Sequence, residues 1–489
     1  MGRKIPTWQV LMVLLFTILT FCYALGILGK ISPALACGYG ELHIPLVVTT
    51  IFAVIVAVAN GYKWSFLEAG MCASIDRAMP SILILITVGM LIGVWIAGGV
   101  VPAMIYYGLM ILRPGYFLVA CCILCGLVAL ATGSSWTTAG TIGVALVGVG
   151  VALGINPAMT AGAIVSGAYF GDKMSPLSDT TNLAPAMAGA NIVDHIRKMM
   201  WSVTPSLIIA LVVFAFLGMG HGGENMDTSL ITSLQAGLQE NFKINPVLLL
   251  PVVVVICIVA LRLPALPGLY GGIALGVIAC FYQGADATQV FTFLHYGFWF
   301  DDPSVVDPYL VDLLTRGGMD GMMWTISMGL AALAFGGVMD ASGMLQTVSE
   351  MLLKFAKGTG SLVTVAVLTC ILVNIVAADQ YLAILLPGRM YKEAFEDARL
   401  HPSCLSRVLE DAGTVTSPIV PWTTCAVTMT SFLGVSAFQY IPYAVLNYVN
   451  PIVSIILGFT GISMQKLTDE EYEVLLKKRE AEKEKLLNA

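Results

Sequence analysis

The sequence predicts an all-α polytopic membrane protein, and three observations support this fold class. Of the 489 residues, 58% are hydrophobic and only 11% are charged, whereas a soluble domain carries about 25% charged residues. Many apolar runs are long enough to cross a bilayer, which takes about 20 helical residues. Two apolar stretches are interrupted by small polar residues, at Gly133 to Gly140 and at Ala377 to Tyr381. We therefore expect about ten transmembrane helices and two re-entrant hairpins, with broken helices at the membrane midplane.

The apolar runs that we expect to cross the membrane are spread along the whole chain. The clearest are Trp8 to Gly29, Ser81 to Ala97, Trp201 to Gly220, Pro246 to Ala260 and Tyr440 to Thr460. The first run is too long for the apolar part of a signal peptide and lacks a clear cleavage site. We therefore expect it to be retained as a helix.

The distribution of Lys and Arg orients the chain, because short loops rich in these residues stay in the cytoplasm. Arg3 and Lys4 place the N-terminus inside, and the charged tail from Lys466 is expected inside as well. The connections at residues 220–245 and 283–320 are acidic with few basic residues, so we expect them outside. This alternation requires that residues 113–154 and 361–388 turn back without crossing the membrane.

The two halves of the sequence resemble each other. Residues 90–103 align without gaps to residues 328–341 at an offset of 238, with five identities, and residues 175–181 parallel residues 417–424 at offsets of 242 and 243. The two hairpin breaks lie about 245 residues apart. We therefore expect a first inverted repeat at residues 1–220, an extracytoplasmic connection at 221–245, a second inverted repeat at 246–465 and a charged cytoplasmic tail at 466–489. Inverted repeats with interrupted helices are typical of secondary transporters.

The two hairpin breaks and two Ser-Pro breaks are expected to converge on one ion- or substrate-binding site. Proline disrupts the helical hydrogen bonds around it, so free carbonyls would join hydroxyls and carboxylates in an oxygen-rich cage, which suits a hard cation such as Na⁺. Among the candidates, Asp172, Asp179 and Asp379 are the expected Na⁺ ligands. The full candidate set is Ser134, Ser135, Thr137, Thr138, Asp172, Ser175, Asp179, Thr180, Asn182, Asp379, Gln380, Ser417, Thr423 and Thr424.

Each candidate also has a structural interpretation. Ser and Thr commonly pack at interfaces between membrane helices, and Asp172 could be paired with its neighbour Lys173. Ionisable groups at membrane depth are costly and usually functional, which favours the carboxylates, and Asp379 first because apolar residues flank it on both sides. Glu410 and Asp411 are expected to open the last broken helix, and capping of its N-terminus is the structural interpretation of these two acids. His195 is expected on the cytoplasmic surface.

Three segments carry a resemblance to a known family: GSSWTTAGTIG from Gly133, GDKMSPLSDTTNLAP from Gly171 and ADQYLAILLPGRMY from Ala378. In these segments the sequence resembles the NhaC family of Na⁺/H⁺ antiporters, which includes a Na⁺-linked malate/lactate antiporter, and the resemblance spans nearly the whole chain. It implies a bacterial inner-membrane antiporter with a scaffold domain and a transport domain that moves as an elevator, often in a dimer. It also implies an ion-site region at Ser134 to Thr138, Asp172 to Asn182 and Asp379, and it leaves the substrate open.

The expected function is Na⁺/H⁺ antiport. Burial favours the neutral form of a carboxylate, so Na⁺ and H⁺ would compete for one group. The alternative is Na⁺- or H⁺-coupled exchange of a small organic solute, such as a dicarboxylate, lactate or an amino acid. A dicarboxylate would need an Arg or several helix N-termini, and the charged candidates near the motifs are Lys173 and Arg389.

The sequence does not predict an enzyme, because it contains neither a Gly-x-Ser-x-Gly elbow nor a His-Glu-x-x-His pair. We expect no cofactor other than Na⁺ as the transported or coupling ion. The expected partners are Na⁺, H⁺, the lipid bilayer and a second copy of the chain, with an organic anion or amino acid in the alternative function and no nucleic acid.

The predicted topology is tested by cysteine labelling on a background from which the native cysteines have been removed. A cysteine at Asp302→Cys should react with a membrane-impermeant reagent only from outside, whereas one at Lys466→Cys should react only from the cytoplasm. Labelling of Asp302→Cys from the cytoplasmic face alone would contradict the inverted-repeat topology.

Overall fold

The structure is a computed structural model, and it describes residues 3–30, 32, 35–220, 228–260, 265–473 and 479. Every regular element in these residues is a helix, and the β-type pairing among them consists of two isolated bridges, Phe298 with Arg316 and Leu400 with Lys466. The predicted all-α fold class is therefore confirmed.

The helices of the first half run from the N-terminal segment to the long helix before residue 220. They are α1 (Thr7–Ala24), α2 (His43–Ala59), α3 (Trp64–Ala97), α4 (Val100–Ile111), α5 (Pro114–Thr132), α6 (Ser135–Thr138), α7 (Val144–Ala152), α8 (Pro157–Met174), α9 (Asp179–Ala188) and α10 (Ile192–Met219). A π-helical turn, η3 (Ala139–Gly143), joins α6 to α7.

The helices of the second half begin after the segment that the structure leaves undescribed. They are α11 (Thr228–Asn241), α12 (Leu250–Ala260), α13 (Ala265–Gln283), α14 (Ala287–Tyr296), α15 (Pro308–Leu314), α16 (Met323–Ala341), α17 (Met344–Leu353), α18 (Thr359–Ala377), α19 (Gln380–Asp397), α20 (Pro402–Leu409), α21 (Thr424–Leu433), α22 (Ala437–Tyr440) and α23 (Val445–Thr460). A second π-helical turn, η7 (Glu410–Thr414), follows α20 directly, and short 3₁₀ turns join several of the other helices.

The length and composition of the helices fit a membrane. Among the described residues, eight helices are long and apolar enough to cross a bilayer, or ten if two pairs bent by 92° and 56° each count as one span. The surface of α10 is apolar as well: the side chains of Ile208, Val212 and Phe216 are 56%, 48% and 66% exposed. These positions are four residues apart and share one helix face. Such a face is stable in lipid rather than in water.

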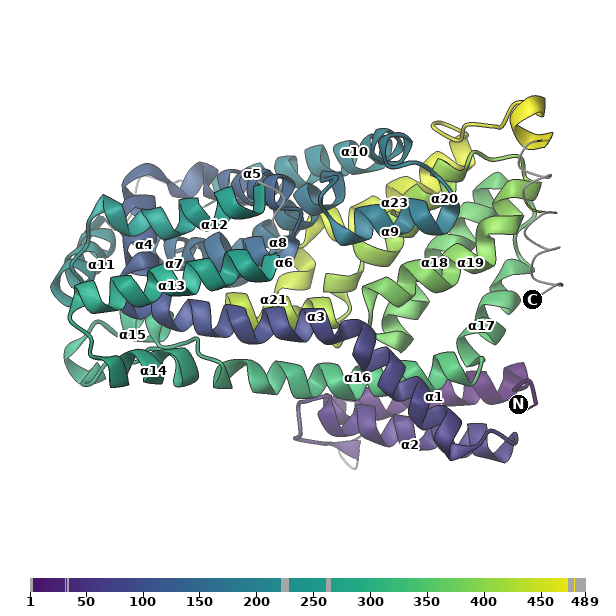
Figure 1. The fold of residues 1–489 in the computed structure, drawn as a ribbon, viewed down its shortest axis with the longest axis horizontal. Coiled ribbons are helices and arrows are strands. Elements are labelled where there is room, and N and C mark those ends of the chain that lie inside the picture. Colours follow the sequence, from purple (N-terminus) through teal and green to yellow (C-terminus); the bar gives the residue numbers. More distant parts are fainter. Residues whose placement is uncertain are drawn as a thin grey trace.

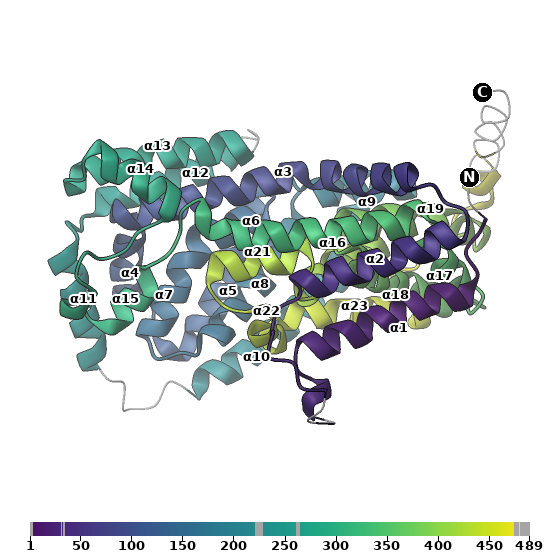
Figure 2. The same ribbon diagram turned by 90° about the horizontal axis from the view of Figure 1, so that it is seen from below.

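The two ends of the molecule hold different parts of the chain. The start of α1 and the segment that follows α23 lie at one end, and α11, α14 and α15 lie at the opposite end (Figure 1). At the first end, Lys4 contacts Glu350 of α17, and Arg399 forms an ion pair with Asp469. The described helices of the predicted extracytoplasmic connections, α11, α14 and α15, thus lie opposite the start of α1. Figure 2 shows α1, α2 and α16 side by side on one flank.

The same order of turns and helix caps occurs twice along the chain, 245 positions apart. α5 and α18 each end in a residue with a positive φ and are followed at once by an N-cap whose side chain accepts a backbone hydrogen bond. α5 follows α4 at one end of the molecule, and α18 follows α17 at the other (Figure 1). The matched pairs are Gly133 and Ala378, Ser134 and Asp379, Gly154 and Arg399, Asn156 and His401, Ser178 and Thr423, and Gly189 and Gly434.

These turns correct two of the alignments made from sequence. The turn after α3 is at Gly99 and the turn after α16 is at Gly343, with φ angles of 79° and 71°. The offset of 238 pairs Gly98 with Gly336 instead, and Gly336 lies inside α16. The two Ser-Pro motifs do not correspond either, because the matched caps are Ser178 and Thr423. Gly and Val are common in membrane helices, so short identities in the wrong register are easily found.

α5 and α8 pack against each other so closely that glycine is required at the contact. A Cβ atom on Gly167 of α8 would lie 2.0 Å from the carbonyl oxygen of Cys122, and one on Gly171 would lie 2.0 Å from that of Gly126. Small residues allow membrane helices to approach in this way. This contact places the end of α8, which carries Asp172 and Lys173, beside the hairpin that follows α5.

We expect Gly167→Ala to destabilise the protein, because α8 would have to move away from α5. Overpacking of this kind costs about 1–3 kcal/mol, and a fall in thermal unfolding temperature in detergent would measure it. Gly329→Ala in α16 is the matched control, because a Cβ atom there meets no atom within 4 Å. Equal unfolding temperatures for the two variants would contradict the assigned role of Gly167.

Candidate functional site

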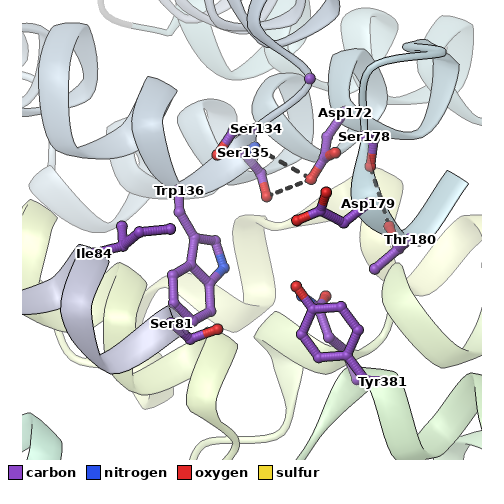
Figure 3. Close-up of a pocket in the computed structure, with 12 residues that line it drawn as sticks. Ser81, Ile84, Ser134, Ser135, Trp136, Asp172, Ser178, Asp179, Thr180 and Tyr381 are labelled. Atoms are coloured by element: carbon purple, nitrogen blue, oxygen red, sulfur yellow. Dashed lines mark hydrogen bonds between the residues drawn. The ribbon is translucent and has the colours of Figure 1, made fainter. Parts of the chain in front are cut away.

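A small polar cavity lies in the middle of the molecule, where the first hairpin meets α8, α9 and the start of α19. Its volume is about 50 Å³, enough for a few water-sized groups. Figure 3 shows side chains from four separate segments around it. They are Ser81, Ile84, Gly133, Ser134, Ser135, Trp136, Asp172, Ser178, Asp179, Thr180, Gln380 and Tyr381.

The break between α5 and α6 brings two serines to the cavity. Gly133 has a φ of 66°, and a Cβ atom there would lie 2.7 Å from the backbone carbon of Leu177 and 2.9 Å from the nitrogen of Ser178. Glycine therefore lets the break touch the α8–α9 connection. Ser134 caps the new helix by accepting a hydrogen bond from the amide of Thr137 at 3.1 Å.

Asp172 is the carboxylate most firmly held at the cavity. Its side chain lies on the last turn of α8, and the residue is only 7% exposed. One carboxylate oxygen, Oδ2, accepts hydrogen bonds from the Ser135 hydroxyl at 2.7 Å and from the Ser135 amide at 3.2 Å (Figure 3). These bonds connect the first hairpin to α8.

Asp179 is the second carboxylate at the cavity, and its environment is different. It is the first residue of α9, where a negative charge interacts favourably with the helix dipole. Its side chain is exposed and points into the cavity between Ser135 and Tyr381 (Figure 3). Among the described residues, no hydrogen bond to the Asp179 carboxylate is seen, although this carboxylate lines the cavity. Its oxygens are therefore available to a ligand.

A buried ammonium group lies behind the cavity. The Nζ atom of Lys173 is fully buried and lies 3.4 Å from Asp172 Oδ2 and 3.1 Å from Glu410 Oε1. Lys173 also donates a hydrogen bond of 2.6 Å to the hydroxyl of Thr180, which donates one of 2.9 Å to Glu410. Both candidate interpretations of Asp172 therefore hold in part: it lines the cavity, and it is near Lys173.

Glu410 and Asp411 do not open a helix as expected, and the capping interpretation of these two acids is wrong as well. α20 begins at Pro402 after the cap His401, and both carboxylates lie in the π-helical turn at its end, fully buried. Asp411 accepts hydrogen bonds from Ser202 and Asn450 and lies 3.5 Å from Nε of Arg407. The signal that would have found them is two adjacent acids in a stretch, residues 402–435, where Arg407 is the one other charged residue. Such charges are costly at membrane depth.

His195 is also placed differently from the prediction. It lies in the first turn of α10, is fully buried, and its Nδ1 atom lies 2.9 Å from the hydroxyl of Ser406 on α20. The flanking charges of the Asp-His-Ile-Arg-Lys segment suggested a surface site. The period of the helix turns His195 towards the interior, whereas Arg197, two residues further on, is exposed on another face.

Asp379, the first choice from sequence, is not among the residues that line the cavity. It is 4% exposed, and its carboxylate accepts a hydrogen bond of 2.9 Å from the amide of Leu382 as the N-cap of α19. Its neighbours Gln380 and Tyr381 line the cavity instead. The second hairpin therefore reaches the cavity through the amide of Gln380 and the phenol of Tyr381, and not through the carboxylate of Asp379.

The remaining candidates fall into two groups. Ser134, Ser135, Asp172, Asp179, Thr180 and Gln380 line the cavity, whereas Thr137, Thr138, Ser175, Asn182, Ser417, Thr423 and Thr424 do not. Asn182 is exposed and donates to the carbonyls of Pro176 and Ser178. Thr423 caps α21, and the amide of Thr424 donates to the carbonyl of Ala378, so these two residues connect the second hairpin to α21.

Sequence reasoning missed Ser81, Ile84, Trp136, Ser178 and Tyr381. Trp136, Ser178 and Tyr381 lie inside the motifs already noted, so the motifs themselves were a sufficient signal. Ser81 and Ile84 belong to α3, which passes the hairpin only in the folded chain. Among the described residues, no three or more His, Cys, Asp or Glu side chains are grouped so that they could hold a metal ion. A cation here would therefore be held by two carboxylates with hydroxyl, amide or water oxygens.

Interrupted helices that meet at ionisable side chains inside a polytopic helical membrane protein are features of secondary transporters. The chain belongs to the Na⁺/H⁺ antiporter family, whose family model matches residues 167–462. It is therefore a multi-pass membrane protein of an antiporter family.

Three relatives show the range of this family. The chain is 39% identical to the Na⁺/H⁺ antiporter NhaC of Alkalihalophilus pseudofirmus, over 87% of this chain and 92% of the relative. It is 36% identical to the malate-2H⁺/Na⁺-lactate antiporter of Bacillus subtilis, over 86% of this chain and 89% of the relative. It is also 36% identical to the arginine/ornithine antiporter ArcD of Halobacterium salinarum, over 84% and 85%.

We expect Ser135→Ala to weaken the apparent affinity for Na⁺ by about fivefold to tenfold, because Asp172 would lose one of its hydrogen bonds. Such a bond is worth about 1 kcal/mol. The measurement is the Na⁺ dependence of transport in proteoliposomes. Ser349→Ala is the matched control, because the buried Ser349 hydroxyl donates only to a carbonyl of its own helix. An unchanged Na⁺ dependence for Ser135→Ala would place the cation site elsewhere.

Proposed function

We propose that the protein is a Na⁺/H⁺ antiporter and that the cavity between the first hairpin, α8, α9 and α19 is its cation site. One observation carries the proposal: the buried carboxylate of Asp172 and the accessible carboxylate of Asp179 line the same small cavity with serine hydroxyls. Oxygen ligands of this kind suit a hard cation. We propose Asp172, Asp179 and Ser135 as the residues that bind Na⁺.

The charges behind the cavity support an exchange mechanism. When ionised, Asp172, Lys173 and Glu410 together carry one net negative charge in a region where all three are buried. An uncompensated charge inside a membrane protein is costly. A bound Na⁺ or a bound proton would neutralise this buried charge equally well; the charge of Asp179, which is exposed, is not part of this count. Exchange follows if the binding region changes sides only when it is neutral.

The size of the cavity favours an ion over an organic solute. Sites for drug-sized molecules measure about 300–1,000 Å³, whereas this cavity measures about 50 Å³. The second candidate function is Na⁺- or H⁺-coupled exchange of an organic anion or amino acid. It is supported by the relatives named for malate, lactate, arginine and ornithine. A solute of that size would need the cavity to widen.

We further propose how the chain is organised in the membrane. Residues 1–220 and 246–465 would form inverted repeats around the cavity, which is supported by the repeated caps and by the entry of α5 and α18 from opposite ends. The hairpins would be re-entrant and would belong to a moving domain of elevator type. The family relationship supports a place in the cytoplasmic membrane. We also propose that both termini are cytoplasmic and that the protein forms a homodimer.

The proposed function is tested in proteoliposomes loaded with a pH-sensitive dye. An inward Na⁺ gradient should alkalinise the lumen without any added solute, and Asp172→Asn should abolish this response while the protein still inserts and purifies. Asp179→Asn should weaken it strongly. Asp379→Asn should retain it, because Asn is as good an N-cap as Asp.

Two outcomes would contradict this assignment. Full activity of both Asp172→Asn and Asp179→Asn would exclude the cavity carboxylates as the coupling groups. A lumenal pH response that appears only after addition of malate, lactate, arginine or ornithine would replace Na⁺/H⁺ exchange by the second candidate function.

A further inference from the structure

Glu410 is a buried carboxylate that does not line the cavity. It is fully buried, its Oε1 atom lies 3.1 Å from the Nζ atom of Lys173, and it accepts a hydrogen bond of 2.9 Å from Thr180. Its other oxygen, Oε2, has no hydrogen-bond partner among the described residues. Lys173 is the cation that compensates its charge.

Lys173 is shared unequally between two carboxylates. Its ammonium group is closer to Glu410, at 3.1 Å, than to Asp172, at 3.4 Å, and its 2.6 Å hydrogen bond to Thr180 holds it on the Glu410 side. Asp172 receives its hydrogen bonds from Ser135, at the wall of the cavity. The ammonium therefore forms its shorter ion pair with Glu410 and its longer one with Asp172.

We propose that Glu410 is a positioning residue for the cation site: by holding the ammonium group of Lys173, it keeps Asp172 available to a cation in the cavity. This inference rests on the proposed function, because it takes the cavity as the Na⁺ site. Without the charge of Glu410, Asp172 would be the nearest carboxylate to a buried ammonium. The ammonium would then form a full ion pair with Asp172 and compete with Na⁺ for it.

Among the described residues, no other acidic side chain near Glu410 is placed to take over this role. Asp411 is directed to Arg407 on its own helix, to Ser202 of α10 and to Asn450 of α23.

The helices packed against this turn contribute uncharged groups. The amide of Asn374 on α18 donates to the carbonyls of Ala412 and Gly413, and α19 contributes the apolar side chain of Ile384. The charged residues that act on Glu410 are thus Lys173 and Asp172, both from α8.

The first test measures how proton movement by the Glu410→Gln variant depends on Na⁺ concentration. This substitution removes the charge of the side chain and keeps its size. The KM for Na⁺ should rise by about tenfold or more, because a cation within a few ångströms of a carboxylate weakens binding of a second positive charge by that factor. Glu410→Asp keeps the charge but draws it back from Lys173, so its KM should lie between those of Glu410→Gln and wild type.

The decisive test is the double variant Lys173→Met with Glu410→Gln. It removes the ammonium that is proposed to block Asp172, so the KM for Na⁺ should return to within about threefold of wild type. A purely structural role for the pair predicts the opposite, because the second substitution would add to the damage of the first. Replacing both members of a buried ion pair by neutral groups is also better tolerated than removing one.

Glu396→Gln is the matched control, because Glu396 is a buried glutamate at the end of α19 that faces Arg479 rather than Lys173. It should leave the KM for Na⁺ unchanged. The inference is overturned if folded Glu410→Gln has the KM of wild type, or if the double variant is as impaired as Glu410→Gln. If the Glu410→Gln variant does not insert into the membrane, the double variant decides alone. A raised KM for Na⁺ in the double variant then overturns the inference.

These outcomes are distinct from failure of the proposed function. If wild-type protein shows no Na⁺-dependent proton movement, the antiport function itself is contradicted. If wild type is active and its KM is insensitive to the charge of Glu410, only the positioning role is contradicted.

Discussion

The ammonium group of Lys173 is the charge around which the polar interior of the protein is arranged. It is fully buried, and its nearest charged neighbours are Glu410 at 3.1 Å and Asp172 at 3.4 Å. An ammonium in a place without water must be compensated by protein groups. This requirement connects α8 to the π-helical turn after α20, and through Thr180 it also connects α9. The hydrogen bonds from Ser135 to Asp172 then attach the first hairpin to the same cluster.

The π-helical turn at Glu410–Thr414 places two neighbouring carboxylates in two different networks. Glu410 faces Lys173 and Thr180, whereas Asp411 faces Arg407, Ser202 and Asn450. Turns of this kind are rare and often lie at functional sites. The carbonyls of Ala412 and Gly413 are satisfied by the side chain of Asn374. This segment therefore connects the helices around the cavity to α10 and α23.

The two hairpins have the same backbone arrangement at their breaks but use different side chains there. Each has a residue with positive φ, Gly133 or Ala378, and then an N-cap, Ser134 or Asp379, which satisfies amides that the break would leave without partners. At membrane depth such amides cannot turn to water. The carboxylate of Asp379 is used for this purpose. That is why the acids at the cavity come from α8 and α9.

Composition and pattern alone determined the fold class, the two helix breaks, the spacing of about 245 residues between them and the motifs that surround the cavity. These are local properties, because apolar run length, small polar interruptions and proline act over a few residues. Only the tertiary structure decided which acids meet. Asp172 and Asp179 line one cavity and Glu410 lies behind it, because α8 packs closely on α5 and the chain turns after α20. The side chains of Asp379 and Asn182 form hydrogen bonds with backbone groups outside this cavity. The direction of a side chain and the partner across a helix interface depend on packing between distant segments, which no local pattern contains.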